Sequence, residues 1–287
     1  EIYTLSLHDA LPIYELEIFM AEQLGFIGAG NMAQAIFKGI LKTKKFAATD
    51  IHIYDPDGDK LRQLTEAYGV IGEASNIHVC THADVLFLCT KPNVYPTIIN
   101  EIKSAVDVNT VIVTIAAGQS IRRTESRFEK KIHLIRVMPN TPALVGEGMA
   151  ALTANALVTD AELALVLSIF RSLGKAEIVP ETLMDAVTGL SGSAPAFVFM
   201  FIEALADGAV QTGMPRTQAY TFAEQTVLGS AKMLLESGKH PGELKDMVTS
   251  PAGTTIEGVL SLEANGFRSA VADAVIAATE KSSIMGK

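Results

Sequence analysis

The stretch Gly25-Phe26-Ile27-Gly28-Ala29-Gly30-Asn31-Met32-Ala33 decides the fold of this chain. An apolar run from Gln23 leads into it, and the residues from Met32 to Leu41 have the apolar spacing of a helix, so we expect a strand, a glycine turn and a helix. In this context the pattern Gly-x-Gly-x-x-Ala indicates dinucleotide binding. The alternative is a glycine turn that only connects a strand to a helix.

Each small residue of this turn has a physical reason to be there. Gly28 permits the tight turn, Gly30 lets the backbone approach a pyrophosphate, and Ala33 lets the helix pack on the strand. The first helical residues, Asn31 and Met32, offer backbone N–H groups at the positive end of the helix dipole. We therefore predict that these five residues bind NADPH or NADH.

Outward from the turn, predicted strands and helices alternate. The expected strands lie at 51–54, 85–89, 111–115 and 133–137, and the expected helices at 60–68, 97–105 and 121–128. A helix at 161–172 and a last strand near 176–179 follow. Repeated strand–helix units predict an α/β fold with a doubly wound, mostly parallel sheet, which is a Rossmann domain. We assign it to residues 20–180.

The remaining residues, 181–287, have mostly helical periodicity and are expected to form an all-helical domain. The segment 195–212 is apolar on most of its circumference, which predicts burial on several sides and an obligate homo-oligomer. The most apolar part, 194–206, is bounded by Asp207 and interrupted by Glu203, and it is shorter than the ~20 residues that span a bilayer. No membrane segment is expected.

The composition argues against other classes of protein. A net charge of -9 without a basic stripe argues against nucleic acid as a partner. The 2 Cys residues indicate a reducing compartment, so we expect a cytoplasmic protein. We interpret the 6 His residues as lacking a metal-ligand pattern, and no metal is predicted.

Residues 1–19 are expected to be a non-native extension. The chain starts without Met, its first Met is Met20, and residues 1–19 contain no Lys or Arg, unlike the basic start of a signal peptide.

Asp55 ends the second predicted strand and has two interpretations. Its carboxylate can accept hydrogen bonds from ribose hydroxyls and repel a 2′-phosphate, which favours NAD. It is equally consistent with an ordinary solvated turn that continues through Asp57 and Asp59. Lys60 and Arg62 could still reach a phosphate, so the sequence leaves the choice between NADPH and NADH open.

Further motifs continue along the chain. They are Lys91-Pro92, Ala116-Ala117-Gly118, Arg136-Val137-Met138-Pro139-Asn140-Thr141-Pro142, Thr188-Gly189-Leu190-Ser191-Gly192-Ser193-Ala194-Pro195-Ala196 and Ser250-Pro251-Ala252-Gly253-Thr254-Thr255. Together with the glycine turn, they resemble the pyrroline-5-carboxylate reductase family from about Gln23 to the C-terminus.

The resemblance implies a Rossmann domain followed by an all-α dimerisation domain, with the active site between them and dimers that assemble into decamers. It implies NAD(P)H-dependent reduction of 1-pyrroline-5-carboxylate to L-proline. By resemblance, further cofactor contacts come from Asn76, Lys91, Pro92, Ala117 and Gly118. Met138, Asn140 and Thr141 are expected to line the cleft around the nicotinamide and the substrate.

The small-residue loop before a helix predicted to begin at about Ile256 presents backbone N–H groups to an anion. In isolation, a plain Ser/Thr helix cap explains it as well. The resemblance implies that Ser250, Gly253, Thr254 and Thr255 hold the substrate carboxylate.

The resemblance also places the Thr255 hydroxyl beside the imine nitrogen. A threonine hydroxyl is a poor general acid, so orientation is its expected role and proton delivery is a hypothesis. The family usually has glycine where this chain has Ala252, and a positive φ there would add strain.

Two other functions compete. A beta-hydroxyacid dehydrogenase shares the two-domain plan but uses a helical lysine as its acid/base group, and no Lys occurs here between Lys175 and Lys232. A catalytically silent nucleotide-sensing scaffold would keep the fold, but we would expect its loop at 250–255 to be degraded.

Overall fold

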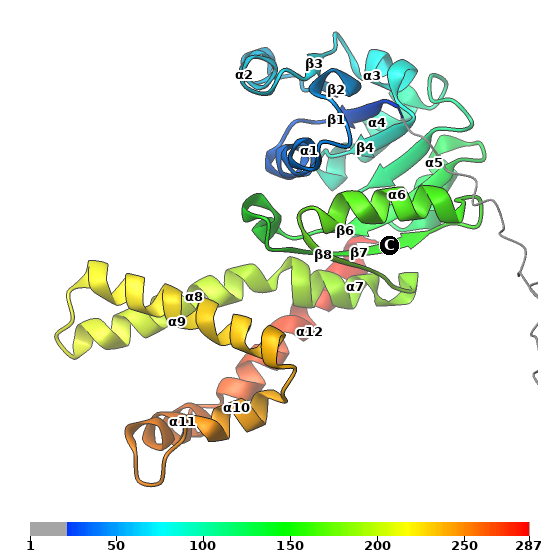
Figure 1. Ribbon diagram of the computed structural model, residues 1–287. Helices are drawn as coiled ribbons and strands as arrows, with labels where there is room; N and C mark the ends of the chain where they lie inside the picture. Colours follow the sequence, from blue (N-terminus) through cyan, green and yellow to red (C-terminus); the bar gives the residue numbers. More distant parts are fainter. Residues whose placement is uncertain (1–21, 287) are drawn as a thin grey trace, which may run out of the picture.

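The computed structural model describes residues 22–286. The predicted extension at 1–19 lies outside the described residues. An α/β domain forms one end of the molecule, and a helical domain extends from it as an arm (Figure 1).

An eight-stranded sheet organises the first domain, in the order β3-β2-β1-β4-β5-β6-β7-β8. The strands are β1 (Leu24–Ile27), β2 (Ile51–Tyr54), β3 (Ile71–Gly72), β4 (Val85–Leu88), β5 (Val111–Thr114), β6 (His133–Met138), β7 (Gly148–Ala154) and β8 (Gly174–Ile178). The pairings from β3 through to β6 are parallel, β7 is antiparallel to β6, and β8 is parallel to β7. The strand order reverses between β1 and β4, where doubly wound folds bind their ligands. The predicted Rossmann fold is confirmed.

Helices cover both faces of the sheet. They are α1 (Asn31–Thr43), α2 (Gly58–Tyr68), α3 (Asn76–His82), α4 (Tyr95–Ile102), α5 (Ile121–Phe128) and α6 (Asp160–Arg171). Because strand side chains alternate, Phe26 faces α1 and α6 while its neighbour Ile27 faces α3, α4 and α5. Phe26 stacks on Phe87 of β4, with ring centroids 4.6 Å apart. Each face therefore has its own apolar core.

The second domain contains only helices in the part of the chain that the structure describes. They are η4 (Glu181–Leu183), α7 (Met184–Val187), the π-helix η5 (Thr188–Gly192), α8 (Ala194–Gln211), α9 (Arg216–Ser237), α10 (Pro241–Met247), α11 (Thr254–Ala264) and α12 (Phe267–Met285). The α8 and α9 helices form a hairpin, and α12 returns to pack on α7 and η5. Arg123 of α5 donates a hydrogen bond to the carbonyl of Met285, at 3.0 Å, which ties the end of α12 to the first domain.

The helical domain exposes large apolar side chains. Phe199 and Met200 of α8 are 64% and 67% exposed, and Phe222 of α9 is 64% exposed. The continuous helical run Glu181–Gln211 is long and apolar enough to cross a membrane, by length and composition alone. The expectation of no membrane segment considered only residues 194–206, a shorter segment, and therefore did not find it. An exposed apolar surface of this kind also marks a protein interface.

Two strands and one α-helix of the first domain were not predicted from the sequence. The β3 strand has only two residues and α3 only seven, too short for a periodic pattern. The β7 strand, Gly148–Ala154, is rich in Ala and Gly, which have low strand propensity. Its pairing between β6 and β8 decides its conformation.

Candidate active site

The glycine turn fits a dinucleotide phosphate. Gly28 has a φ of +89°, and a Cβ there would lie 2.9 Å from Cγ2 of Thr90, after β4. Gly30 is the N-cap of α1 and makes no side-chain cap, and a Cβ built on it would meet no atom within 4 Å. The first turn of α1 therefore presents its N–H groups to open space, as anion binding requires.

Asp55 fastens the end of β2 to this turn. Its Oδ2 accepts a hydrogen bond from the Ala29 N–H at 2.9 Å, and its Oδ1 accepts from the Asp57 N–H and the Lys60 ammonium, each at 3.1 Å. Burial acts to raise the pKa of Asp55, but these backbone hydrogen bonds and Lys60 outweigh it and lower the pKa below its ordinary value. Asp55 is thus more than the end of a solvated turn: its carboxylate is buried and structural.

The other predicted cofactor residues lie in different surroundings. Lys91 is exposed and precedes the short helix η2 (Pro92–Val94) after β4. Asn76 is buried at the start of α3, where its amide donates to Glu101 Oε2 at 2.9 Å. Their roles in cofactor binding stay predictions.

Ala117 and Gly118 follow β5. Gly118 has a φ of +70°, and a Cβ there would lie 2.9 Å from the Met285 Cβ at the end of α12. Gly118 thus has a packing role against the helical domain, and its predicted cofactor contact is untested.

Met138 and Asn140 lie where the two domains meet. The Asn140 amide donates to the Ser191 carbonyl in η5 at 3.2 Å, and its Oδ1 accepts from the Met149 N–H of β7 at 2.8 Å. A Cβ on Gly192 would lie 2.5 Å from Cε of Met138, so a larger residue there would displace the end of the Met138 side chain. A π-helix leaves carbonyls without regular partners and is frequent at functional sites. Both residues therefore hold the π-helix against the sheet.

Arg136 belongs to the same junction, although the sequence suggested no role for it. Its guanidinium is buried and pairs with Glu181 at 3.1 Å and with Asp185 at 3.9 Å. Glu181 also accepts the Ile121 N–H, at 2.7 Å, and Asp185 accepts the Ser282 hydroxyl, also at 2.7 Å. An arginine inside the apolar strand Leu134–Val137 was the signal that could have revealed this network.

The threonine loop has the geometry of an anion site at a helix start. Thr254 and Thr255 are the first two residues of α11, close to the predicted start at Ile256, and the N-cap Gly253 makes no side-chain cap. The Gly253 N–H donates to the Ser250 carbonyl at 3.1 Å, closing the turn. Ala252 has a φ of +55°, so the strain expected of an alanine there is present.

Within one chain, the two predicted parts of the site lie apart. The helices α10 and α11, orange in Figure 1, lie at the end of the arm away from the sheet that carries the glycine turn. Among the secondary-structure elements, α11 packs mainly on α12. The structure therefore does not bring Thr255 to the glycine turn of the same chain.

Reactive side chains outside these two parts are few among residues 22–286. Burial, with Glu101 nearby, raises the pKa of the Cys80 thiol to about 12, and burial also raises the pKa of the Cys89 thiol, so neither thiol is poised to react.

The side chains of His52, Glu73 and His82 lie together, although their spacing in the sequence gave no sign of this cluster. The prediction of no metal overlooked that His78 and His82 lie four residues apart, and linear spacing cannot reveal a cluster drawn from separate elements.

Comparison with known proteins agrees with this architecture. Residues 181–285 match the family model described as pyrroline-5-carboxylate reductase dimerisation, and residues 23–118 match the model described as NADP oxidoreductase, coenzyme F420-dependent. The pyrroline-5-carboxylate reductase of Escherichia coli is 47% identical over 268 residues, covering 93% of this chain and 100% of the relative. That of Methanosarcina acetivorans is 44% identical over 266 residues, covering 93% of this chain and 98% of the relative.

Solved structures show the same likeness. The Plasmodium falciparum pyrroline carboxylate reductase with NADP bound has a TM-score of 0.84 and 33% identity, covering 92% of this chain and 98% of its own. The Coxiella burnetii enzyme has a TM-score of 0.86 and 32% identity, covering 93% and 99%. Because the similarity extends over both domains, the chain belongs to the pyrroline-5-carboxylate reductase family.

Proposed function

We propose that this chain reduces 1-pyrroline-5-carboxylate to L-proline with NAD(P)H, the last step of proline biosynthesis. The observation that carries the proposal is the pairing, in one chain, of an open glycine turn with an intact threonine loop at a bare helix start. The first suits a pyrophosphate and the second suits a carboxylate. A beta-hydroxyacid dehydrogenase is not favoured because the chain lacks the lysine which that chemistry uses.

The residues of the first domain bind and orient the coenzyme, which when bound supplies the hydride. The N–H groups of the first turn of α1, from Asn31 to Ala33, hold the pyrophosphate, and Gly28 and Gly30 keep the approach open. By analogy with the family, we propose further cofactor contacts from Asn76, Lys91, Pro92, Ala117 and Gly118.

Residues of the helical domain position the substrate. The bare start of α11 offers N–H groups from Gly253, Thr254 and Thr255 to the substrate carboxylate, and Ser250 closes the turn. Protonation of the imine nitrogen makes the ring carbon electrophilic. The N–H of this protonated imine then donates a hydrogen bond to the Thr255 hydroxyl oxygen. Met138 and Asn140 support the cleft by fixing the π-helix.

A second copy of the chain completes each site. The α11 helix, which begins with the threonine loop, lies away from the sheet that carries the glycine turn (Figure 1). The helical arm also exposes apolar side chains of α8 and α9 that an obligate partner would cover. We therefore propose a homodimer in which the loop of one copy faces the glycine turn of the other. Assembly of such dimers into decamers is a further proposal.

NADPH is the proposed coenzyme. The Lys60 ammonium lies 3.1 Å from Asp55 Oδ1 and offsets the charge that would repel a 2′-phosphate. A relative of this chain has been solved with NADP bound. The free thiols Cys80 and Cys89 suit a reducing compartment, so we propose a cytoplasmic enzyme.

A coenzyme assay tests the proposed activity. Oxidation of NADPH and of NADH is followed separately with 1-pyrroline-5-carboxylate at matched concentrations. We expect turnover with both and a higher kcat/KM with NADPH. Folded protein that turns over neither coenzyme would instead be a nucleotide-sensing scaffold.

Mixing two impaired variants tests the shared site. Gly30→Val blocks the cofactor turn and Thr255→Ala removes the hydroxyl, so each variant alone is impaired. After unfolding and refolding together in equal amounts, half of the dimers are hybrids with one intact site, and about a quarter of the wild-type activity returns. A mixture no more active than its two components would mean that both parts come from one chain.

A further inference from the structure

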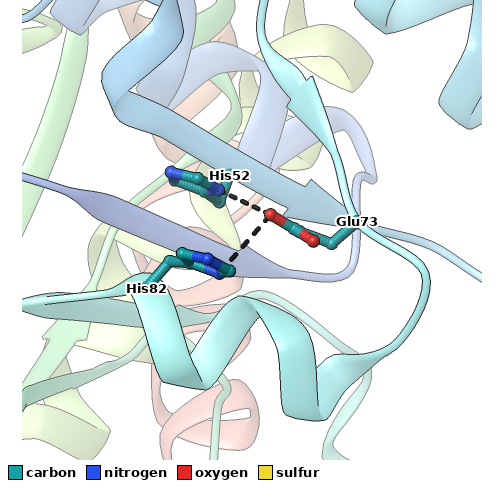
Figure 2. Close-up of side chains that lie close together, drawn as sticks. All are labelled: His52, Glu73 and His82. Carbon is teal, nitrogen blue, oxygen red and sulfur yellow. Dashed lines mark hydrogen bonds and ion pairs between the residues drawn. The ribbon is translucent and has the colours of Figure 1, made fainter.

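Three side chains that can ligate a cation lie together near the outer edge of the sheet. His52 lies in β2, Glu73 directly follows β3, and His82 ends α3 (Figure 2). One ligand atom from each lies within 4.8 Å of the others. His52 is the second residue of β2, whereas Asp55, which contacts the glycine turn, follows the other end of that strand. The cluster is therefore separate from the proposed active site.

Both ring nitrogens of His52 face oxygen atoms. Nε2 lies 2.8 Å from Gln23 Oε1, and Nδ1 lies 2.7 Å from Glu73 Oε1. When the Gln23 oxygen accepts the Nε2–H, the neutral ring directs its Nδ1 lone pair at the Glu73 carboxylate. In this tautomer the Nδ1 lone pair and the Glu73 carboxylate are both free to bind one metal ion. The hydrogen bond from Nε2–H to Gln23 is also the kind of outer contact that orients metal-bound histidines.

His82 supplies the third ligand. Its ring stacks on that of His52, with centroids 4.9 Å apart and planes 1° apart, and its Nδ1 lies 3.6 Å from Glu73 Oε1. Ligand atoms around tetrahedral zinc, with bonds of ~2.0–2.2 Å, lie about 3.3–3.6 Å apart. The pair of His82 and Glu73 already has this separation, and that of His52 and Glu73 must open by less than about 1 Å.

The side chains differ in their freedom to adjust. The side chains of His52 and Glu73 are only 8% and 13% exposed, so the surrounding atoms restrict their movement. The side chain of His82 is 51% exposed, and its Nδ1 lies 2.8 Å from the His78 carbonyl. Because the two rings are stacked in parallel planes, their lone pairs do not converge, and metal binding requires the exposed His82 ring to turn away from that carbonyl. The arrangement is two fixed ligands and one that swings in from solvent.

We propose that His52, Glu73 and His82 bind one Zn²⁺ ion, with Gln23 fixing the His52 tautomer and a solvent molecule in the fourth position. Two imidazoles and one carboxylate form a ligand set that suits zinc, whereas Mg²⁺ and Ca²⁺ prefer oxygen ligands alone. The bound ion connects β2, the end of β3 and the end of α3. Because it binds the folded state, it stabilises the first domain.

Calorimetric titration of the metal-free, full-length protein with ZnCl₂ tests the proposal. We expect one ion per chain and a rise in the unfolding temperature. Because a metal competes with protons for its ligands, the apparent affinity for zinc should also fall as the pH is lowered. Co²⁺ in place of Zn²⁺ should give the visible absorption of a four-coordinate site.

Substitutions on α3 provide the matched comparison. His82→Ala removes an exposed ligand and should weaken zinc binding at least about tenfold, the lower bound for losing even an outer contact of a metal site. His78→Ala removes an exposed histidine one turn earlier and should bind zinc as the wild type does. Glu73→Gln removes the anionic ligand and should also weaken binding.

Wild-type protein that binds no Zn²⁺ would overturn the proposal, and so would a His82→Ala variant that binds zinc with unchanged affinity. The reductase assay is run in parallel without zinc. Its outcome is independent of this site, so failure of one proposal is distinguishable from failure of the other.

Discussion

The guanidinium of Arg136 in β6 lies 3.1 Å from the carboxylate of Glu181, the first residue of the helical domain. Glu181 at the same time accepts the backbone N–H of Ile121 at the start of α5. One buried arginine thus fixes where the helical domain leaves the sheet. The π-helix that follows has its own contact with the first domain, the hydrogen bond from the Asn140 amide to the Ser191 carbonyl.

Arg136→Met should destabilise the protein. The substitution fills the volume but leaves Glu181 and Asp185 without their cation. Both carboxylates are about one-third exposed and can regain water, so we expect a loss of ~1–3 kcal/mol in the free energy of unfolding, less than for a fully buried pair. Urea denaturation measures it. Arg62→Ala, which breaks an exposed pair with Asp59, is the control and should cost less than about 1 kcal/mol.

Ala252→Gly should stabilise the threonine loop. Ala252 has a φ of +55°, a region where an L-residue is strained by ~1–2 kcal/mol and glycine is not. The greater conformational freedom of glycine in the unfolded chain offsets part of this relief. We therefore expect the free energy of unfolding to rise by roughly 0.5–1 kcal/mol, measured by thermal unfolding. Ala252→Val should have the opposite sign, because a branched side chain tolerates positive φ poorly. A glycine variant less stable than the wild type would contradict the φ seen here.

Thr255→Ala should lower turnover. If the hydroxyl orients the protonated imine, its loss removes a hydrogen bond to a charged group, which corresponds to a decrease in kcat/KM of about 10- to 100-fold. Thr255→Ser keeps a hydroxyl and should retain most activity. Steady-state kinetics at saturating coenzyme measure both, with Thr43→Ala at the exposed end of α1 as a control. Unchanged kcat in Thr255→Ala would remove this side chain from the mechanism.

Asp55 should contribute to stability in a pH-dependent way. Its pKa in the folded protein is lowered, so the ionised carboxylate stabilises the fold above the unfolded value of about 4. That contribution is lost as the pH falls through the folded pKa. The difference in unfolding free energy between wild type and Asp55→Asn should be constant near neutrality and shrink below about pH 4. Urea denaturation across pH 3–7 should show this change, and a difference that grows on acidification would contradict it.

The sequence by itself determined the class of fold and where the helices behind its two motifs begin. Local physics was sufficient there: Gly28 needs a positive φ that only glycine adopts freely, and the alternation of apolar strands with amphipathic helices specifies a doubly wound sheet. The start of α11 was predicted within two residues for the same reason, because small residues without a capping side chain mark a helix start open to an anion.

Only the tertiary structure decided which distant residues meet. Asp55, ambiguous in the sequence, is buried because β2 ends beside the glycine turn, and Arg136 acquired its role when β6 brought it to Glu181. His52, Glu73 and His82 converge from two strands and a helix, a contact that no spacing encodes. The separation of Thr255 from the glycine turn likewise follows from the direction of the helical arm, which is set by packing between domains and not by the residues of either motif.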